Sequence, residues 1–347
     1  MSKNPYSDLP DTSFWRRAVS ASQDMIDPVI EPRFTFQASD LVATAGSCFA
    51  QHISRALVSR KFNYYISESG PAERQFGVFS ARYGNIYSVR QLLQLFNRAY
   101  ALFEPFDCAW RRPDGRYADP FRPQVEPGGF ADPEAVIAER TRHLEAVRTM
   151  FENCNIFIFT LGLTEAWYSK RDGAVFPLAP GVVASPDHDD IIFHNFTFGE
   201  MLMDLESFVR KLRCVNPDVR ILFTVSPVPL IATYERRHVL VSTIASKSTL
   251  RAVADELVRR DPGIDYFPSY EMIAAHPSGG RHYTPDLRDV TEQGVRSVME
   301  IFCRHYLSDG AVRPPPSQIK LMRDASAREA ALIALGEIIC DEEAIDE

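Results

Sequence analysis

Long apolar stretches alternate with amphipathic ones along most of this 347-residue chain. Three of the apolar stretches are rich in β-branched or aromatic residues: LVATA at 41–45, NIFIFTLG at 155–162 and RILFTVS at 220–226. A Gly or Ser marks the end of each stretch: Gly46, Gly162 and Ser226. Strands without a polar face are typical of a parallel sheet that is covered by helices on both faces. The pattern therefore predicts that these segments are neighbouring strands of such a sheet.

Between these strands, apolar residues recur every three or four positions, which indicates amphipathic helices. We expect helices near 48–59, near 88–100, over 246–261 and over 289–307. A further helix begins at the N-cap Asp132, another ends at Asn216, and a short strand lies within 264–270. Strands that alternate with helices define an α/β fold, here a three-layer α/β/α sandwich with a mostly parallel sheet. In such folds the ligand binds at the carboxyl ends of the strands.

The composition divides the chain into three parts. Residues 1–38 are rich in Pro and polar residues and are expected to form an arm, whereas residues 39–307 form the domain, with an irregular insertion near 103–132. Residues 308–347 form a tail with a helix-like Ala/Leu segment and an acidic end, CDEEAIDE, which we expect to fray.

Charge and motif content exclude several classes of function. The net charge of −8 gives no field that would attract nucleic acid or an anionic membrane, and no segment is apolar enough to insert into a bilayer. The six cysteines are scattered without a C-x-x-C pair, and nucleotide-binding glycine motifs are absent, so we expect neither a metal nor a cofactor. The N-terminus lacks an apolar signal region, which favours a cytoplasmic location. The oligomeric state is left open.

Polar residues gather where the strands stop: GSC after the first strand, GLTE after the second, SPVP after the third and YTPDLRDV before the last helix. Four such clusters at one edge of a sheet indicate a site. Cys48, at the first turn of a helix, is the candidate nucleophile, because the helix dipole and free backbone N–H groups lower a thiol's pKa. The alternative is that Cys48 is a small buried apolar residue.

GSCFA at 46–50 is the motif that names the GSCFA domain family, and this chain resembles that family over roughly 40–305. The segments RYGNIYS, FTLGLTEAW and FTVSPVPLIAT are also typical of it. The family itself is similar to the SGNH (GDSL-like) hydrolases. The resemblance implies an SGNH/flavodoxin-like sandwich and an esterase or acyltransferase acting on an acyl ester, such as that of a glycan or glycan precursor.

The resemblance also implies roles for single residues. Cys48 stands where SGNH hydrolases carry their nucleophilic Ser, and Ser47, the less favoured nucleophile, stands where they carry Asp. Gly84 would offer a backbone N–H to the oxyanion, and Thr164 replaces the Asn that usually donates a side-chain N–H. Asp286 matches the family's Asp, but Asp289 occupies the position of the expected His.

The missing His leaves the base open. His238 and His282 are the candidate replacements, because each lies near a strand-end cluster, although a structural role is also open for both. The candidate substrate-binding residues are Asn85, Glu165, His194, Asn195 and Lys247. Simpler interpretations exist: Glu165 caps a helix, His194-Asn195 opens a helix, and Ser246-Lys247-Ser248 caps one. Two functions remain: an enzyme with an acyl-enzyme on Cys48, or an inactive protein that binds a sugar or acyl ligand.

Overall fold

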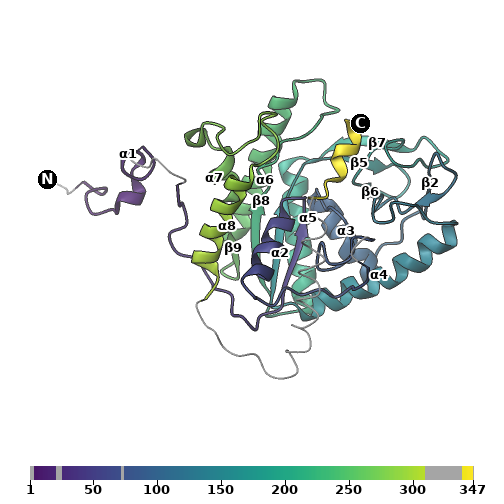
Figure 1. Ribbon diagram of the computed structural model, residues 1–347, viewed down its shortest axis with the longest axis horizontal. Helices are drawn as coiled ribbons and strands as arrows, with labels where there is room; N and C mark the ends of the chain where they lie inside the picture. The colour runs from purple at the N-terminus through teal and green to yellow at the C-terminus, as the bar shows by residue number, and fades with distance from the viewer. Residues whose placement is uncertain (1–3, 21–25, 72–73, 309–337, 347) are drawn as a thin grey trace.

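A four-stranded parallel sheet forms the centre of the computed structural model, which describes residues 4–20, 26–71, 74–308 and 338–346 (Figure 1). The strands are, in spatial order, β1 (Val42–Gly46), β4 (Ile156–Leu161), β8 (Arg220–Val225) and β9 (Ile264–Tyr266). Gly46 lies opposite Thr160, and Leu161 lies opposite Val225. The prediction that the three long apolar segments are neighbouring strands ending at one edge is therefore confirmed.

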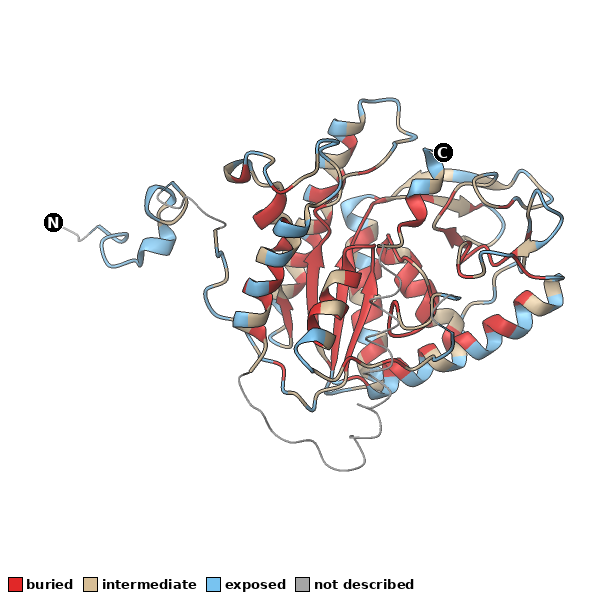
Figure 2. Ribbon diagram, viewed as in Figure 1, coloured by how far each residue is buried: buried red, intermediate tan, exposed pale blue. Residues whose placement is uncertain are grey.

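Helices cover both faces of the sheet, so the predicted three-layer α/β/α fold is confirmed (Figure 2). Alternate residues of each strand point to opposite faces. One face packs against α2 (Ala50–Ser59), α7 (Ser269–Ala274) and α8 (Glu292–Tyr306). The other packs against α3 (Val89–Ala99), α4 (Pro133–Asn153), α5 (Phe198–Val215) and α6 (Val239–Arg260).

Several helices begin at side chains that cap them. Ser88 and Gln91 form a reciprocal capping box at α3, and Thr197 and Glu200 form another at α5. The side chain of Asp132 accepts a hydrogen bond from the backbone N–H of Ala135, which confirms Asp132 as the N-cap of α4. These caps fix where the chain enters each helix next to the sheet.

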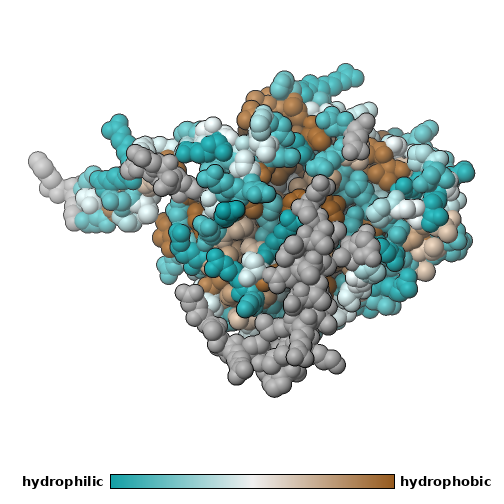
Figure 3. All heavy atoms as spheres, viewed as in Figure 1, coloured by the Kyte–Doolittle hydropathy of each residue, from teal (hydrophilic) through white to brown (hydrophobic). Residues whose placement is uncertain are grey.

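The prediction that α6 begins at residue 246 is wrong. Its N-cap is His238, and Ser246 and Lys247 lie buried in the middle of the helix. The first turns escaped prediction because their apolar residues are exposed and do not face the core: Leu240, Val241 and Ile244. Figure 3 shows hydrophobic residues gathered on the surface at the top of the view, where α6 begins.

A smaller antiparallel sheet, which the sequence did not predict, follows the second long strand. Its strands lie in the order β6 (Val175–Phe176), β5 (Glu165–Ser169) and β7 (Ile191–Asn195). His194 and Asn195 therefore end a strand, and the interpretation that they open a helix is wrong. A hairpin of β2 (Trp110–Arg111) and β3 (Tyr117–Ala118) lies within the 103–132 insertion.

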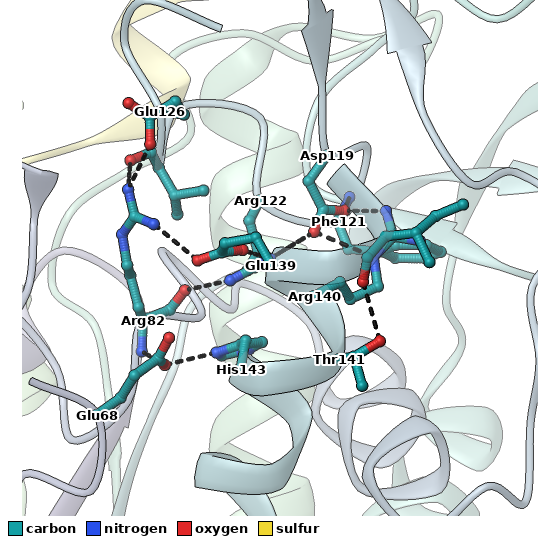
Figure 4. Close-up of polar contacts among 12 residues, drawn as sticks. Glu68, Arg82, Asp119, Phe121, Arg122, Glu126, Glu139, Arg140, Thr141 and His143 are labelled. Atoms are coloured by element: carbon teal, nitrogen blue, oxygen red, sulfur yellow. Dashed lines mark hydrogen bonds and ion pairs between the residues drawn. The ribbon is translucent and has the colours of Figure 1, made fainter. Parts of the chain in front are cut away.

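Buried ion pairs connect the 103–132 insertion and the segment before α3 to α4 (Figure 4). Arg82 contacts Glu139 at 2.7 Å, Arg122 contacts the same carboxylate at 2.5 Å, and Arg140 contacts Asp119 at 2.6 Å. All five side chains are at most 9% exposed. Arg82 is two residues before Gly84, the predicted oxyanion residue. The network therefore fixes the position of the segment that contains Gly84.

The two ends of the described chain contact the domain differently. The N-terminal arm contacts it through Trp15, whose ring stacks on His276 at 5.3 Å. The acidic end does not fray: Asp341 and Glu342 are buried in a short 3₁₀ helix, η4 (Asp341–Ile345). The helix-like Ala/Leu segment expected in the tail lies outside the described residues.

Candidate functional site

Cys48 lies in the turn that connects β1 to α2, and the backbone of this turn requires glycine at position 46. Gly46 has a φ of +136°, and a Cβ at this position would lie 2.3 Å from the carbonyl oxygen of Thr160. The next residue, Ser47, donates its backbone N–H to that same carbonyl at 3.2 Å. This turn places Cys48, 5% exposed, two residues before the first residue of α2, and the carbonyl of Cys48 accepts the backbone N–H of Gln51 at 3.1 Å.

The structure brings the GLTE and RYGN segments to the same place. The backbone N–H groups of Gly162 and Leu163 both donate to the carbonyl of Tyr87, at 3.1 and 2.9 Å. A Cβ on Gly162 would lie 3.2 Å from the Cβ of Ser47, so these two turns are in contact. The N–H of Ile86 donates to the carbonyl of Gly46 at 2.8 Å. Two of the four predicted clusters, GSC and GLTE, therefore adjoin each other and the RYGNIYS segment at the carboxyl edge of the sheet.

Polar side chains at this junction are buried without a full set of partners. The Ser47 hydroxyl and the Asn85 side-chain oxygen have no hydrogen-bond partner among the described residues, although both residues are at most 3% exposed. Gly84, which precedes Asn85, has a φ of +67°. Thr164 is buried nearby, and its backbone N–H donates to the Ser246 hydroxyl at 3.0 Å. Buried polar groups are normally hydrogen-bonded, so these atoms are available to a bound water, ion or ligand.

Lys247 is the buried cation of the site. It is 1% exposed, and its ammonium Nζ donates to the carbonyl of Gly162 at 2.8 Å. Burial lowers the pKa of Lys247, although the nearby Glu342 and Cys48 act in the opposite direction. The interpretation of residues 246–248 as a helix cap is wrong, since Lys247 projects from the middle of α6 toward the strand edge.

The two aspartates of the last cluster lie at the surface, with Arg288 between them. Asp286 accepts hydrogen bonds from the backbone N–H groups of Arg288 and Asp289, at 3.0 and 3.2 Å, and therefore shapes its own turn. A hydrogen bond from the Thr284 hydroxyl is the main cause that lowers the pKa of Asp286. Asp289 pairs with Arg288 at 3.3 Å.

The candidate histidines lie elsewhere. His238 is exposed, and its Nδ1 accepts a hydrogen bond from the backbone N–H of Leu240 as the cap of α6. Burial lowers the pKa of His282, which packs against Gly294. A cavity of about 720 Å³ beside Cys48 is lined, within the described chain, by His52 but by neither of these two. Burial lowers the pKa of His52 to about 4.

Three of the remaining predicted binding residues, Glu165, His194 and Asn195, lie on β5 and β7, and each hydrogen-bonds to a protein partner. Glu165 accepts hydrogen bonds from the Thr233 hydroxyl at 2.6 Å and from the backbone N–H of Tyr234 at 3.3 Å, and burial raises its pKa. Asn195 donates to Glu235 at 2.9 Å. His194 pairs with Glu200 at 2.9 Å. These partners occupy the polar atoms that the sequence had suggested for substrate.

Two features of the site were missed from the sequence. Arg288 contacts Glu342 at 3.3 Å and the sulfur of Cys340 at 3.9 Å. The position of Arg288 between Asp286 and Asp289 in the sequence could have indicated that this arginine belongs to the site. Cys340 lines the same cavity as Cys48, and the neighbouring Cys340, together with burial, raises the pKa of Cys48 well above its usual value. The helix start alone would have lowered it. No local pattern marks Cys340 as a site residue.

The fold and site define a class: a three-layer α/β protein with a buried thiol, a buried lysine and unsatisfied polar groups at the carboxyl edge of a parallel sheet. The GSCFA family model matches residues 41–302, and the chain belongs to the GSCFA family. No curated protein matches the chain. None of the helices in the described ranges is long and apolar enough to cross a membrane.

Proposed function

We propose that this protein is an acyl-ester hydrolase or acyltransferase that forms an acyl-enzyme on Cys48. The observation that carries the proposal is the burial of Lys247 at the strand edge that presents Cys48. Burial lowers the pKa of Lys247, so that part of the population is a neutral amine near neutral pH. A neutral amine can accept the thiol proton, the task that an imidazole performs in SGNH hydrolases.

In this mechanism Lys247 takes the proton of Cys48 while the sulfur attacks the acyl carbon. The alcohol then leaves with that proton, and a thioester remains on Cys48. Water or an acceptor alcohol attacks the thioester, restores the thiol and releases the acyl group. The backbone N–H groups of Cys48 and Gly84 and the Thr164 hydroxyl are the proposed donors to the oxyanion. The substrate class, an ester of a glycan or glycan precursor, rests on analogy with the SGNH hydrolases.

A second candidate function is binding of a sugar or acyl ligand at the same site without turnover. The burial of Cys48 beside Cys340 favours it, because the neighbouring Cys340 and burial raise the pKa of Cys48. A thiol that stays protonated is a poor nucleophile.

Hydrolysis of p-nitrophenyl acetate by the reduced protein, together with the intact mass of the protein during turnover, separates these functions. We expect an acetyl adduct on Cys48 that disappears as substrate is consumed. Cys48→Ala should abolish hydrolysis and Ser47→Ala should weaken it. Thr164→Val should cost on the order of tenfold or more, and Lys247→Met about 10²–10⁴-fold.

Cys303→Ala is the matched control, because Cys303 lies on α8 and does not line the cavity within the described chain, and its activity should equal that of the wild type. Full activity in Cys48→Ala would refute the nucleophile, and full activity in Lys247→Met would refute the base. A wild-type protein that neither acquires the adduct nor hydrolyses the ester would support the binding function.

A further inference from the structure

The last described residues of the chain lie across the candidate site. The side chain of Gln51 pairs with both peptide groups of Ile339: its Nε2 donates to the carbonyl at 2.7 Å, and its Oε1 accepts from the N–H at 3.2 Å. Asn85 Nδ2 donates to the same carbonyl at 3.1 Å, and the Asn85 N–H donates to the Asp341 carboxylate at 3.4 Å. The segment Ile339–Ile345 is therefore held like a bound peptide, above the strand edge in Figure 1.

This segment brings a second thiol to Cys48. Cys340 is 7% exposed and lines the same cavity as Cys48. The Tyr87 hydroxyl and the Arg288 guanidinium each lie 3.9 Å from the Cys340 sulfur. Tyr87 also accepts the backbone N–H of Glu342 at 3.2 Å, which fixes the turn after Cys340. Two thiols that line one cavity, with a guanidinium beside one of them, are an arrangement typical of a redox-active pair.

We propose that Cys48 and Cys340 are a peroxide-responsive thiol pair whose disulfide fastens the C-terminal segment Ile339–Ile345 over the site. The pair is independent of ester hydrolysis, because its formation requires only that the two sulfurs meet. In the reduced protein the segment covers Cys48 through hydrogen bonds, and oxidation makes that cover covalent.

The chemistry needs one equivalent of hydrogen peroxide. The neighbouring Cys48 is the main cause that lowers the pKa of Cys340, and Arg288 acts in the same direction, so Cys340 is the thiol of the pair that ionises more readily. The thiolate sulfur attacks peroxide, forms a sulfenic acid and releases hydroxide. The Cys48 sulfur then attacks that sulfenic sulfur, its proton leaves with the hydroxyl as water, and the S–S bond forms. Two cysteines are oxidised and one peroxide is reduced.

The position of the two cysteines suits this reaction better than that of two other cysteines. Cys48 and Cys340 both line the cavity of about 720 Å³, which gives a small oxidant room to approach. Cys154 is buried within the α3–α5 core, and burial raises its pKa to about 12. Burial also raises the pKa of Cys303. Neither of these two should compete for peroxide.

Peptide mapping of the full-length protein after treatment with one equivalent of hydrogen peroxide tests the pair. We expect a cross-linked peptide that contains Cys48 and Cys340, a loss of two hydrogen atoms in the intact mass, and reversal of both by dithiothreitol. The cross-link should be absent in Cys340→Ser and unchanged in Cys303→Ser. Recovery of Cys340 as a sulfinic acid, or its pairing with a different cysteine, would overturn the proposal.

Hydrogen exchange of residues 338–346 tests the fastening separately. Exchange of these amides should be slower in the oxidised protein than in the reduced protein, and dithiothreitol should restore the faster rate. Cys340→Ser should show no change on peroxide treatment. Equal exchange in oxidised and reduced wild type would show that the disulfide does not hold the segment. Neither measurement depends on esterase activity. Both can therefore be interpreted even if the protein does not hydrolyse esters.

Discussion

At the scale of single residues, the site depends on a glycine that no other residue can replace. Gly46 combines a φ of +136° with direct contact between its Cα and the backbone of the adjacent strand, where a Cβ would lie 2.3 Å from the Thr160 oxygen. The turn that carries Ser47 and Cys48 exists because the chain passes this close to β4. The first residue of the GSCFA motif is thus explained by packing, and the chemistry belongs to the residues that follow.

We expect Gly46→Ala to destabilise the fold by at least about 3 kcal/mol, because the substitution adds both a steric clash and backbone strain. Urea unfolding followed by circular dichroism measures this loss. Gly199→Ala is the matched control: Gly199 lies in the first turns of α5 with no atom within 4 Å of an added Cβ. Its stability should stay within about 1 kcal/mol of the wild type. Equal losses in both variants would contradict the packing argument.

At the scale of elements, the buried ion pairs position the loop that leads to Gly84. Asp119 is fully buried, and although burial opposes its ionisation, Arg140 and Arg122 lower the pKa of Asp119. Arg122 also donates to the carbonyl of Arg82 at 3.2 Å, so the network reaches the backbone just before Gly84. A network of this kind fixes a unique arrangement of the insertion against α4.

Loss of one partner from this network should be costly. We expect Asp119→Asn to destabilise the protein by about 3–5 kcal/mol, because Arg140 loses its carboxylate partner and Arg122 loses one of its two in a buried place. Asp11→Asn, which removes the exposed partner of Arg17, should change stability by less than about 0.5 kcal/mol. Thermal unfolding of both variants measures the difference. A small loss in Asp119→Asn would mean that water replaces the lost charge.

The sheet could be predicted from the sequence because β1, β4 and β8 are apolar on both faces, a pattern that few other structures produce. The meeting of the GSC and GLTE turns followed from that topology. The first turns of α6 could not be predicted, since Leu240, Val241 and Ile244 point to solvent. The contact of Cys340 with Cys48 joins residues almost a whole chain apart, and no periodicity carries such information.

At the scale of the whole molecule, the C-terminal segment docks onto the matched domain at the site, through Gln51, Asn85 and Arg288. The segment buries two carboxylates. Burial raises the pKa of Asp341 to about 6, opposed by hydrogen bonds from Asn85. Burial also raises the pKa of Glu342, against the attraction of Arg288 and Lys247 and with the help of Asp341 and Glu165. Docking of the segment therefore takes up protons.

The sign of the pH dependence follows from these raised pKa values. Docking is most favoured below the ordinary aspartate pKa of about 4, and it weakens as the pH rises through about 6, the docked pKa of Asp341. A shift of about two units corresponds to a change on the order of a hundredfold in the docking equilibrium. Glu342 acts in the same direction. The reduced protein should consequently uncover Cys48 more often at alkaline pH, where a thiol is also more reactive.

Hydrogen exchange of residues 338–346 in the reduced protein, corrected for the intrinsic effect of pH, measures this opening. We expect protection that falls by on the order of a hundredfold between about pH 4 and about pH 8. Asp341→Asn should reduce that slope, because an amide in the same place carries no titrating proton, and the part that remains should come from Glu342. Asp346→Asn is the matched control, since Asp346 is exposed, and its slope should equal that of the wild type. A slope that persists unchanged in Asp341→Asn would assign the opening to Glu342 or to the thiol pair, and protection that rises with pH would contradict proton-linked docking altogether.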